Sequence, residues 1–164
     1  MTSTLKSLFD QCAQLKNPRL EFLPADFGSH REIILRDLNE LRAAALAGHE
    51  KTVVVLAGSL IEAVLYCFLQ TQQEYISTRR GVEFQFNPGH TLEKYVRVFN
   101  RYFSDVVPNV PLPDVVVRYR NLVHIDCEID SPSGTCTIAS RELLQMLEGL
   151  LAGLAEFSEG AGSG

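Results

Sequence analysis

The chain lacks the residue patterns of several common kinds of functional site. No glycine-rich loop follows a strand-like segment, which argues against a P-loop or a Rossmann-type nucleotide site. G-x-S-x-G, H-E-x-x-H and calcium-loop motifs are absent as well. The four cysteines form no C-x-x-C pair and the four histidines are scattered, so we expect no metal and no cofactor. The cysteines are expected to be reduced thiols of an intracellular protein.

The chain also has fewer cationic than anionic residues and lacks a segment typical of a signal peptide or a membrane span. Fifteen Lys and Arg stand against 20 Asp and Glu, a net charge of -5, so the chain lacks the global positive field of a general nucleic-acid coat protein. Its first 15 residues contain no apolar core of a signal peptide. The longest apolar stretch, from Val53 to Leu69, is short for a membrane span and carries Glu62 at its middle. These features predict a cytoplasmic protein that does not enter a membrane.

The 164 residues suit one folded domain, because 46% are hydrophobic and only 21% are charged. We expect this domain to occupy residues 1–157. The last residues, 158–164, read SEGAGSG and predict a flexible tail.

Apolar residues recur at helical spacing along most of the chain. The expected helices run over residues 3–16, 29–48, 49–77, 91–103, 113–129 and from 140 to the tail. Ser29 is followed by Glu32 and Ser140 by Glu142, and both serines are expected to cap their helices. Residues 79–90 predict an extended segment or a loop. Five to six helices with short connections predict an all-α bundle with little or no strand.

The third expected helix is apolar almost all round, which is typical of the central helix of a bundle. Ser59, Glu62 and Tyr66 are three and four residues apart and therefore share one face. A buried carboxylate is costly unless it is paired, and this helix offers no cation nearby. We therefore expect Glu62 to pair with Arg120 or, as second choice, with Arg118.

The segment RYRNLVH, residues 118–124, combines side chains that can act on a phosphodiester. On a helix Arg120 and His124 share a face, Asn121 lies on its flank, and Arg118 lies about 120° from His124. Arginine offers forked donors to phosphate oxygens, and histidine moves protons near neutral pH. Together they suffice for metal-free attack of an RNA 2′-hydroxyl on its own phosphate. The alternative is that they only tie this helix to Glu62.

A second set of side chains leaves two interpretations open. Arg79, Arg80, Arg97 and Arg101 form either a solvated face or an RNA-facing patch, and we favour the solvated face. The aromatic residues Phe84, Phe86, Tyr102 and Phe103 either stack on bases or pack in the core or a dimer interface. We favour packing for them.

The motif RYRNLVH follows a proline-bounded loop and resembles the R-N-x-x-H motif of HEPN-like domains. VVVLAGSLIEAVL is similar to the central helix of bacterial HEPN-like proteins that carry RNLIHP, and the likeness covers about residues 30–157. The resemblance implies a helical bundle, commonly dimeric, whose RNase site pairs the motifs of two chains. The family leaves four to six residues between Arg and His. Arg118 fits that spacing, whereas Arg120 and Asn121 match the RN element.

The resemblance implies a metal-independent endoribonuclease of a defence or toxin–antitoxin system. His124 would be the general acid and base, Arg118 and Arg120 would hold phosphate, and Asn121 would orient the phosphate or His124. The residues expected to support this site are Ser59, Glu62 and Tyr66. The expected partners are RNA, a second copy of the chain and an operon-encoded protein. The alternative is a non-catalytic HEPN-like module for interaction or for binding a nucleotide or RNA.

Overall fold

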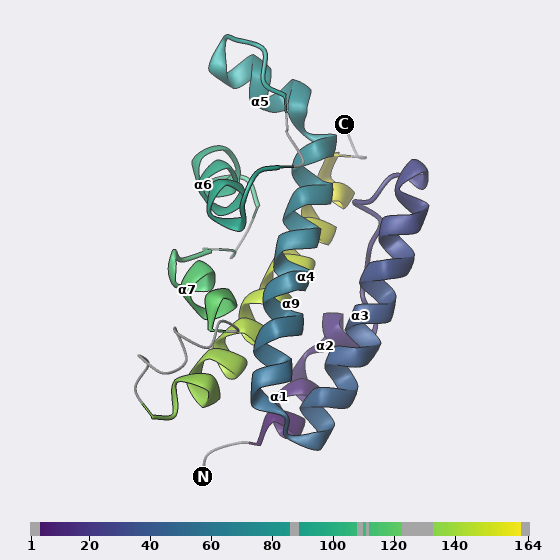
Figure 1. The fold of residues 1–164 in the computed structure, drawn as a ribbon. Coiled ribbons are helices and arrows are strands. Elements are labelled where there is room, and N and C mark those ends of the chain that lie inside the picture. Colours follow the sequence, from purple (N-terminus) through teal and green to yellow (C-terminus); the bar gives the residue numbers. More distant parts are fainter. Residues whose placement is uncertain (1–3, 86–88, 108–109, 111, 123–132, 162–164) are drawn as a thin grey trace.

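A computed structural model of the chain is built from helices packed around one central helix (Figure 1). It describes residues 4–85, 89–107, 110, 112–122 and 133–161, and in these residues there is no strand. The elements are α1 (Leu5–Gln11), α2 (Ala13–Lys16), the 3₁₀ helix η1 (Ala25–Phe27), α3 (Gly28–Ala47), α4 (Glu50–Thr71), α5 (Gln73–Arg80), α6 (Leu92–Phe103), α7 (Val115–Asn121) and α9 (Thr135–Ala161). The predicted all-α class is confirmed.

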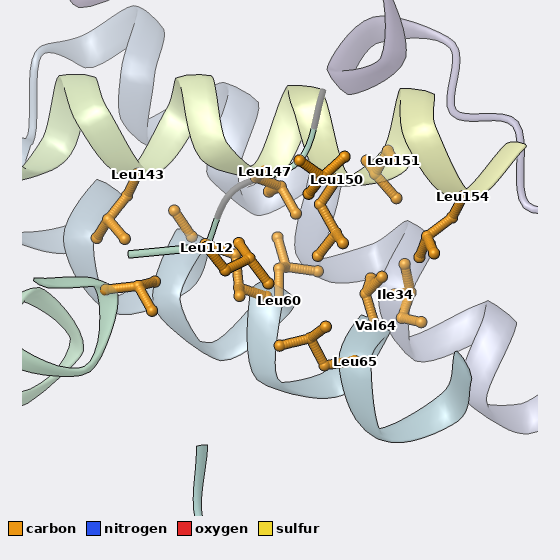
Figure 2. Packing of buried hydrophobic residues seen from close by; sticks show 14 of the residues in the cluster. Ile34, Leu60, Val64, Leu65, Leu112, Leu143, Leu147, Leu150, Leu151 and Leu154 are labelled. Carbon is orange, nitrogen blue, oxygen red and sulfur yellow. The ribbon is translucent and has the colours of Figure 1, made fainter. Parts of the chain in front are cut away.

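Helix α4 is the centre of the bundle, as its nearly uniform apolar sequence predicts. It contacts α3 on one side, α6 and α7 on the other, and α9, which crosses it obliquely (Figure 1). Figure 2 shows the core between these helices, with Leu143, Leu147, Leu150, Leu151 and Leu154 of α9 facing Leu60, Val64 and Leu65 of α4. Burying each of these side chains contributes about 1.5–3 kcal/mol. The packing against α9 therefore fixes the position of α4.

The first expected helix, over residues 3–16, is divided at Cys12. This residue has an extended backbone (φ -87°, ψ 97°) and lies between α1 and α2. The Glu148 carboxylate of α9 accepts hydrogen bonds from the backbone N–H groups of Gln14 and Leu15, at 3.1 and 3.0 Å. These N–H groups begin α2 and have no partner within it, so Glu148 acts as their cap and stabilises the break.

The third expected helix, over residues 49–77, is also divided. α4 ends at Thr71 and α5 begins at Gln73. The Thr71 hydroxyl donates a hydrogen bond of 2.7 Å to the carbonyl of Phe68, and such bonds from threonine back to the helix bend it. α5 then ends at Gly81, whose φ of 69° favours glycine. The two divisions explain why the structure has more helices than the expected five to six.

Two of the predicted helix caps are wrong. α3 begins at Gly28, directly after η1, so Ser29 lies inside the first turn and makes no capping hydrogen bond. α9 begins at Thr135, so Ser140 is buried within this helix. Its hydroxyl donates a hydrogen bond of 3.0 Å to the Thr137 carbonyl. Serine competes for helix carbonyls in this way as readily as it caps, and the sequence pattern alone does not separate the two roles.

The remaining helix ends agree with the sequence to different degrees. α3 ends at Ala47 and is followed by Gly48 in the left-handed conformation, and α6 ends at Phe103, both within one residue of the expected ends. α9 continues to Ala161, past the expected end at residue 157. The expected helix over residues 113–129 is described only to Leu122, and its last part lies outside the described residues. Residues 81–85 form no regular element, which fits the loop alternative for 79–90.

Of the described residues, those of α4 form one helix long and apolar enough to cross a membrane. Most of that segment is buried inside the bundle. This is the pattern of the core helix of a soluble protein.

Candidate functional site

The site begins where α7 packs against α4 at Gly58. A Cβ atom on Gly58 would lie 2.9 Å from Cγ of Arg120 and 3.3 Å from its Cα. The absent side chain therefore lets the stem of Arg120 pass directly over the α4 backbone. Gly58 was not among the residues predicted for the site. An isolated glycine within a long apolar helix often marks such a close approach.

One turn beyond Gly58, Glu62 meets the guanidinium group of Arg120. Nη2 of Arg120 lies 3.2 Å from Oε2 of Glu62, which confirms the expected pairing with the first-choice arginine. The two side chains are 36% and 27% exposed, respectively. The pair therefore lies at the edge of the bundle rather than in its interior, where the apolar sequence of α4 had placed it. Solvent screening lowers its energy below that of a fully buried pair.

This ion pair forms one wall of a pocket of about 320 Å³ between α4, α6 and α7. The polar residues lining it are Glu62, His90, Thr91, Glu93, Arg120 and Asn121. Leu92 and Val117 supply its apolar part. Both carboxylates have cationic partners, because Glu93 is bound to Arg97 at 2.6 Å and Glu62 to Arg120. The pocket is therefore not an acidic one.

Three of the expected site residues come together in this pocket, namely Glu62, Arg120 and Asn121. Arg118 does not join them. It is exposed, and a separation of two residues places it about 200° around the helix from Arg120. His124 lies outside the described residues.

Ser59 and Tyr66 share the open face of α4 with Glu62 but do not line the pocket. Ser59 is exposed. The Tyr66 ring lies 6.0 Å from that of Tyr95 in α6 and 6.1 Å from the imidazole of His30 in α3. Burial, and then the negative charge of Glu62, raise the pKa of Tyr95, so its hydroxyl stays protonated at neutral pH.

The segment before α6 contributes residues to the pocket that were not predicted from the sequence. His90 and Thr91 line the pocket directly before this helix begins, and Glu93 lies in its first turn. The first backbone N–H groups of a helix carry partial positive charge. A guanidinium, a carboxamide, an imidazole and a helix N-terminus thus face one cavity. Because histidine has no periodic signal, only its position directly before Thr91, the residue that precedes α6, could have indicated this.

Two hydrogen bonds fix α7 at the pocket. The Tyr119 hydroxyl donates to Oε2 of Glu142 in α9 at 2.7 Å, and this bond to a carboxylate raises the pKa of Tyr119. The Asn100 side chain of α6 donates to the Leu112 carbonyl at 2.7 Å and anchors the segment that leads into α7. α7 has only seven residues, so these bonds and the packing at Gly58 set its orientation.

Within the described residues, no three His, Cys, Asp or Glu side chains are grouped as they would be around a metal ion. The search for similar proteins gives no significant match to a protein-family model, to a curated protein or to a solved structure.

Proposed function

We propose that the pocket at Arg120 binds a phosphodiester of RNA and that the protein is a metal-independent endoribonuclease. The observation that carries the proposal is the convergence of Arg120, Asn121 and His90 on one cavity. Guanidinium and carboxamide groups bind phosphate oxygens, and imidazole transfers protons near neutral pH.

Arg120 keeps donors for a phosphate although it pairs with Glu62. Its guanidinium group has five N–H donors, and the hydrogen bond to Glu62 uses one of them. The ion pair and the contact with Gly58 hold the side chain in place. A positioned cation stabilises the charge that develops on a phosphate during cleavage without further reorganisation.

Two histidines supply the proton transfers in this mechanism. His90 lines the pocket, and His124 follows Asn121 by three residues, a length of chain that spans at most ~11 Å. One imidazole takes the proton of the RNA 2′-hydroxyl, whose oxygen attacks the adjacent phosphorus. The bond from phosphorus to the 5′-oxygen breaks, and the other histidine protonates that oxygen. The products are a 2′,3′-cyclic phosphate and a 5′-hydroxyl.

The wider assignment follows the resemblance to HEPN-like domains and is part of the proposal. We propose a cytoplasmic homodimer in which Arg118, exposed on the far side of α7, serves the site of the second chain. An RNase of this kind fits a defence or toxin–antitoxin system with an operon-encoded partner.

A non-catalytic module is the second candidate, and one observation favours it. Arg120 lies against Gly58 and pairs with Glu62, which is what a purely structural tie between α4 and α7 requires. In that case the pocket binds a nucleotide or RNA without cleaving it.

Cleavage of a fluorescent RNA by the purified protein in EDTA separates the two candidates. We expect cleavage that stops when the scissile nucleotide is 2′-deoxy. Substituting His90→Gln or His124→Ala should each lower the rate about 10²–10⁴-fold, the usual contribution of general acid–base catalysis. The matched control is His49→Gln, an exposed histidine outside the pocket, which should leave the rate unchanged. Cleavage that needs magnesium, or that survives both substitutions, would contradict the mechanism. RNA binding without cleavage would favour the non-catalytic module.

A further inference from the structure

A second group of cationic side chains lies on α5 and α6, outside the Arg120 pocket. Three arginines each hold the guanidinium carbon over an aromatic ring, 5.0 to 5.5 Å from its centroid. The pairs are Arg79–Tyr75, Arg80–Phe84 and Arg101–Tyr102. These distances are those of cation–π interactions. We call Arg79, Arg80 and Arg101 the arginine track.

The charges of the arginine track are not neutralised by neighbouring carboxylates. All three side chains are exposed, and in the described part of the chain none of them forms a salt bridge. By contrast, Arg19, Arg36 and Arg97 each have a carboxylate oxygen at 2.6 to 2.7 Å. The aromatic rings hold the guanidinium groups of the track near fixed positions, which lowers the entropy lost when they bind a ligand.

The two helices that carry the track meet through their aromatic residues. The Tyr75 ring of α5 stacks on the Phe103 ring at the end of α6, with centroids 5.1 Å apart. Arg79 lies over that same Tyr75 ring, and Arg101 lies two residues before Phe103. Arg101 therefore lies about 200° around α6 from Phe103, on the outward face of this helix, while Arg79 and Arg80 lie beside the aromatic contact on α5.

Helix α6 runs from the pocket to Arg101. Its first turn, with Thr91 and Glu93, lines the pocket, and its last turn carries Arg101. Glu93, Arg97 and Arg101 are four residues apart and exposed, so they share the outward face of the helix. Eight residues of helix span about 12 Å, which separates Arg101 from the pocket rim by a few nucleotides at most.

The chemistry of the track fits a polyanion with accessible base faces. Residues 73–107 contain five Lys or Arg against four Asp or Glu, although the whole chain has a net charge of -5. Phosphate groups therefore meet a part of the molecule that does not share the net negative charge of the chain. Guanidinium planes also stack on unpaired nucleobases, whereas a duplex hides its base faces and a phosphopeptide has none.

We propose that the arginine track binds single-stranded RNA beside the pocket and leads it to Arg120. This inference rests on the proposed function, because the Arg120 pocket is the site to which the bound strand is led. The sequence favoured a solvated face for these arginines, and this proposal takes the alternative of an RNA-facing patch instead. The track binds phosphates through charge and bases through the guanidinium planes.

The test measures binding separately from cleavage. The probe is a fluorescent, single-stranded 2′-O-methyl RNA of about 12 nucleotides, which lacks the 2′-hydroxyl nucleophile, and the readout is anisotropy across a salt series. The triple variant Arg79→Gln, Arg80→Gln, Arg101→Gln should lose at least tenfold in affinity. Its slope of log K against log salt should become shallower by about 2, because each lost contact with a single strand contributes about 0.7.

A matched variant controls for net charge. Lys6→Gln, Arg36→Gln and Arg42→Gln remove the same three charges from exposed positions on α1 and α3, and α3 flanks α4 on the side opposite α6 (Figure 1). This variant should bind within threefold of the wild type and keep its salt slope. Equal losses in the two triple variants would overturn the track, as would wild-type binding by the first.

Two further comparisons test what the track recognises. Replacing its three arginines by lysine should keep the salt slope but weaken binding, because lysine keeps the charge and lacks the stacking plane. A duplex of the same length should bind more weakly than the single strand. Equal binding of the duplex, or displacement by inorganic polyphosphate at the same phosphate concentration, would show that only charge is read and would overturn the assignment to single-stranded RNA. If binding depends on the track and no cleavage occurs, the track stands and the proposed RNase function fails.

Discussion

Replacing Gly58 by alanine tests the packing on which the pocket depends. The new Cβ would lie 2.9 Å from Cγ, 3.0 Å from Cβ and 3.3 Å from Cα of Arg120. Of these three atoms, rotation about the Cα–Cβ bond of Arg120 moves only Cγ. The close contacts with Cβ and Cα are relieved only if α7 itself shifts. Overpacking of this kind costs about 1–3 kcal/mol. The higher helix propensity of alanine opposes it by about 1 kcal/mol. We expect the free energy of unfolding to fall by about 0–2 kcal/mol.

Urea unfolding followed by circular dichroism at 222 nm measures this change. The matched control is Gly28→Ala, in the first turn of α3, where a Cβ would meet nothing within 4 Å. Alanine there should stabilise by about 0.4–1 kcal/mol, chiefly by restricting the unfolded chain. The two variants should therefore differ by about 0.4–3 kcal/mol. Equal stability of Gly58→Ala and Gly28→Ala would refute the close approach at Gly58.

A double-mutant cycle with Glu62→Gln extends this test to the ion pair. In the wild-type background, Glu62→Gln should cost about 1 kcal/mol, because the pair with Arg120 is partly exposed and screened by solvent. In the Gly58→Ala background the shifted α7 should already have weakened that pair. Glu62→Gln should then cost about half as much, a coupling of about 0.5 kcal/mol or more. Additive effects would show that the ion pair does not depend on the glycine contact.

Two further predictions concern α7 and the core. Tyr119→Phe removes the donor to Glu142 and should lower the free energy of unfolding in urea by about 1–2 kcal/mol. The control Tyr102→Phe should be nearly neutral. Equal costs would contradict the role of Tyr119 in anchoring α7. Burial raises the pKa of Cys12 and of Cys67 from 9.0 to about 11. Between pH 9 and pH 11 the folded state therefore binds more protons than the unfolded state, and the free energy of unfolding falls as pH rises. The wild type should lose stability between pH 8 and pH 10.5, and Cys67→Ala should reduce this loss by about 2 kcal/mol. Urea unfolding at both pH values measures the loss, and an unchanged loss would contradict the burial of this thiol.

Local patterns in the sequence were sufficient to predict the class of fold and the central helix. The Glu62–Arg120 pair was predictable because a carboxylate within an apolar helix needs a partner, and few arginines were available. The break at Cys12 was not predictable, since its cap, Glu148, lies 134 residues beyond Gln14 in the sequence. The pattern at Ser140 matched a helix start, but the preceding residues are equally able to form helix, and α9 begins five residues earlier.

The pocket could be predicted only in part, because its two walls follow different rules. The wall from α4 and α7 is formed by the Glu62–Arg120 ion pair and by part of the RYRNLVH motif, and both were predictable from the sequence. The wall before α6 depends on how a segment without periodicity returns to α4, which is decided by tertiary packing. His90 enters the site in this way, so a scattered histidine in the sequence is not evidence against its presence in a site.

The placement of Gly58 and Glu62 on the central helix links the stability of the bundle to the geometry of the pocket. One face of α4 packs against leucines of α9. The opposite face carries Gly58 and Glu62, which position Arg120 through a close contact and an ion pair. Because α7 has only seven residues, it has little helical stability of its own and takes its orientation from α4 and α9. A change in core packing beneath Gly58 would therefore move Arg120 without altering any residue that lines the pocket. We expect core substitutions in α4 to reduce binding at the pocket before they unfold the protein.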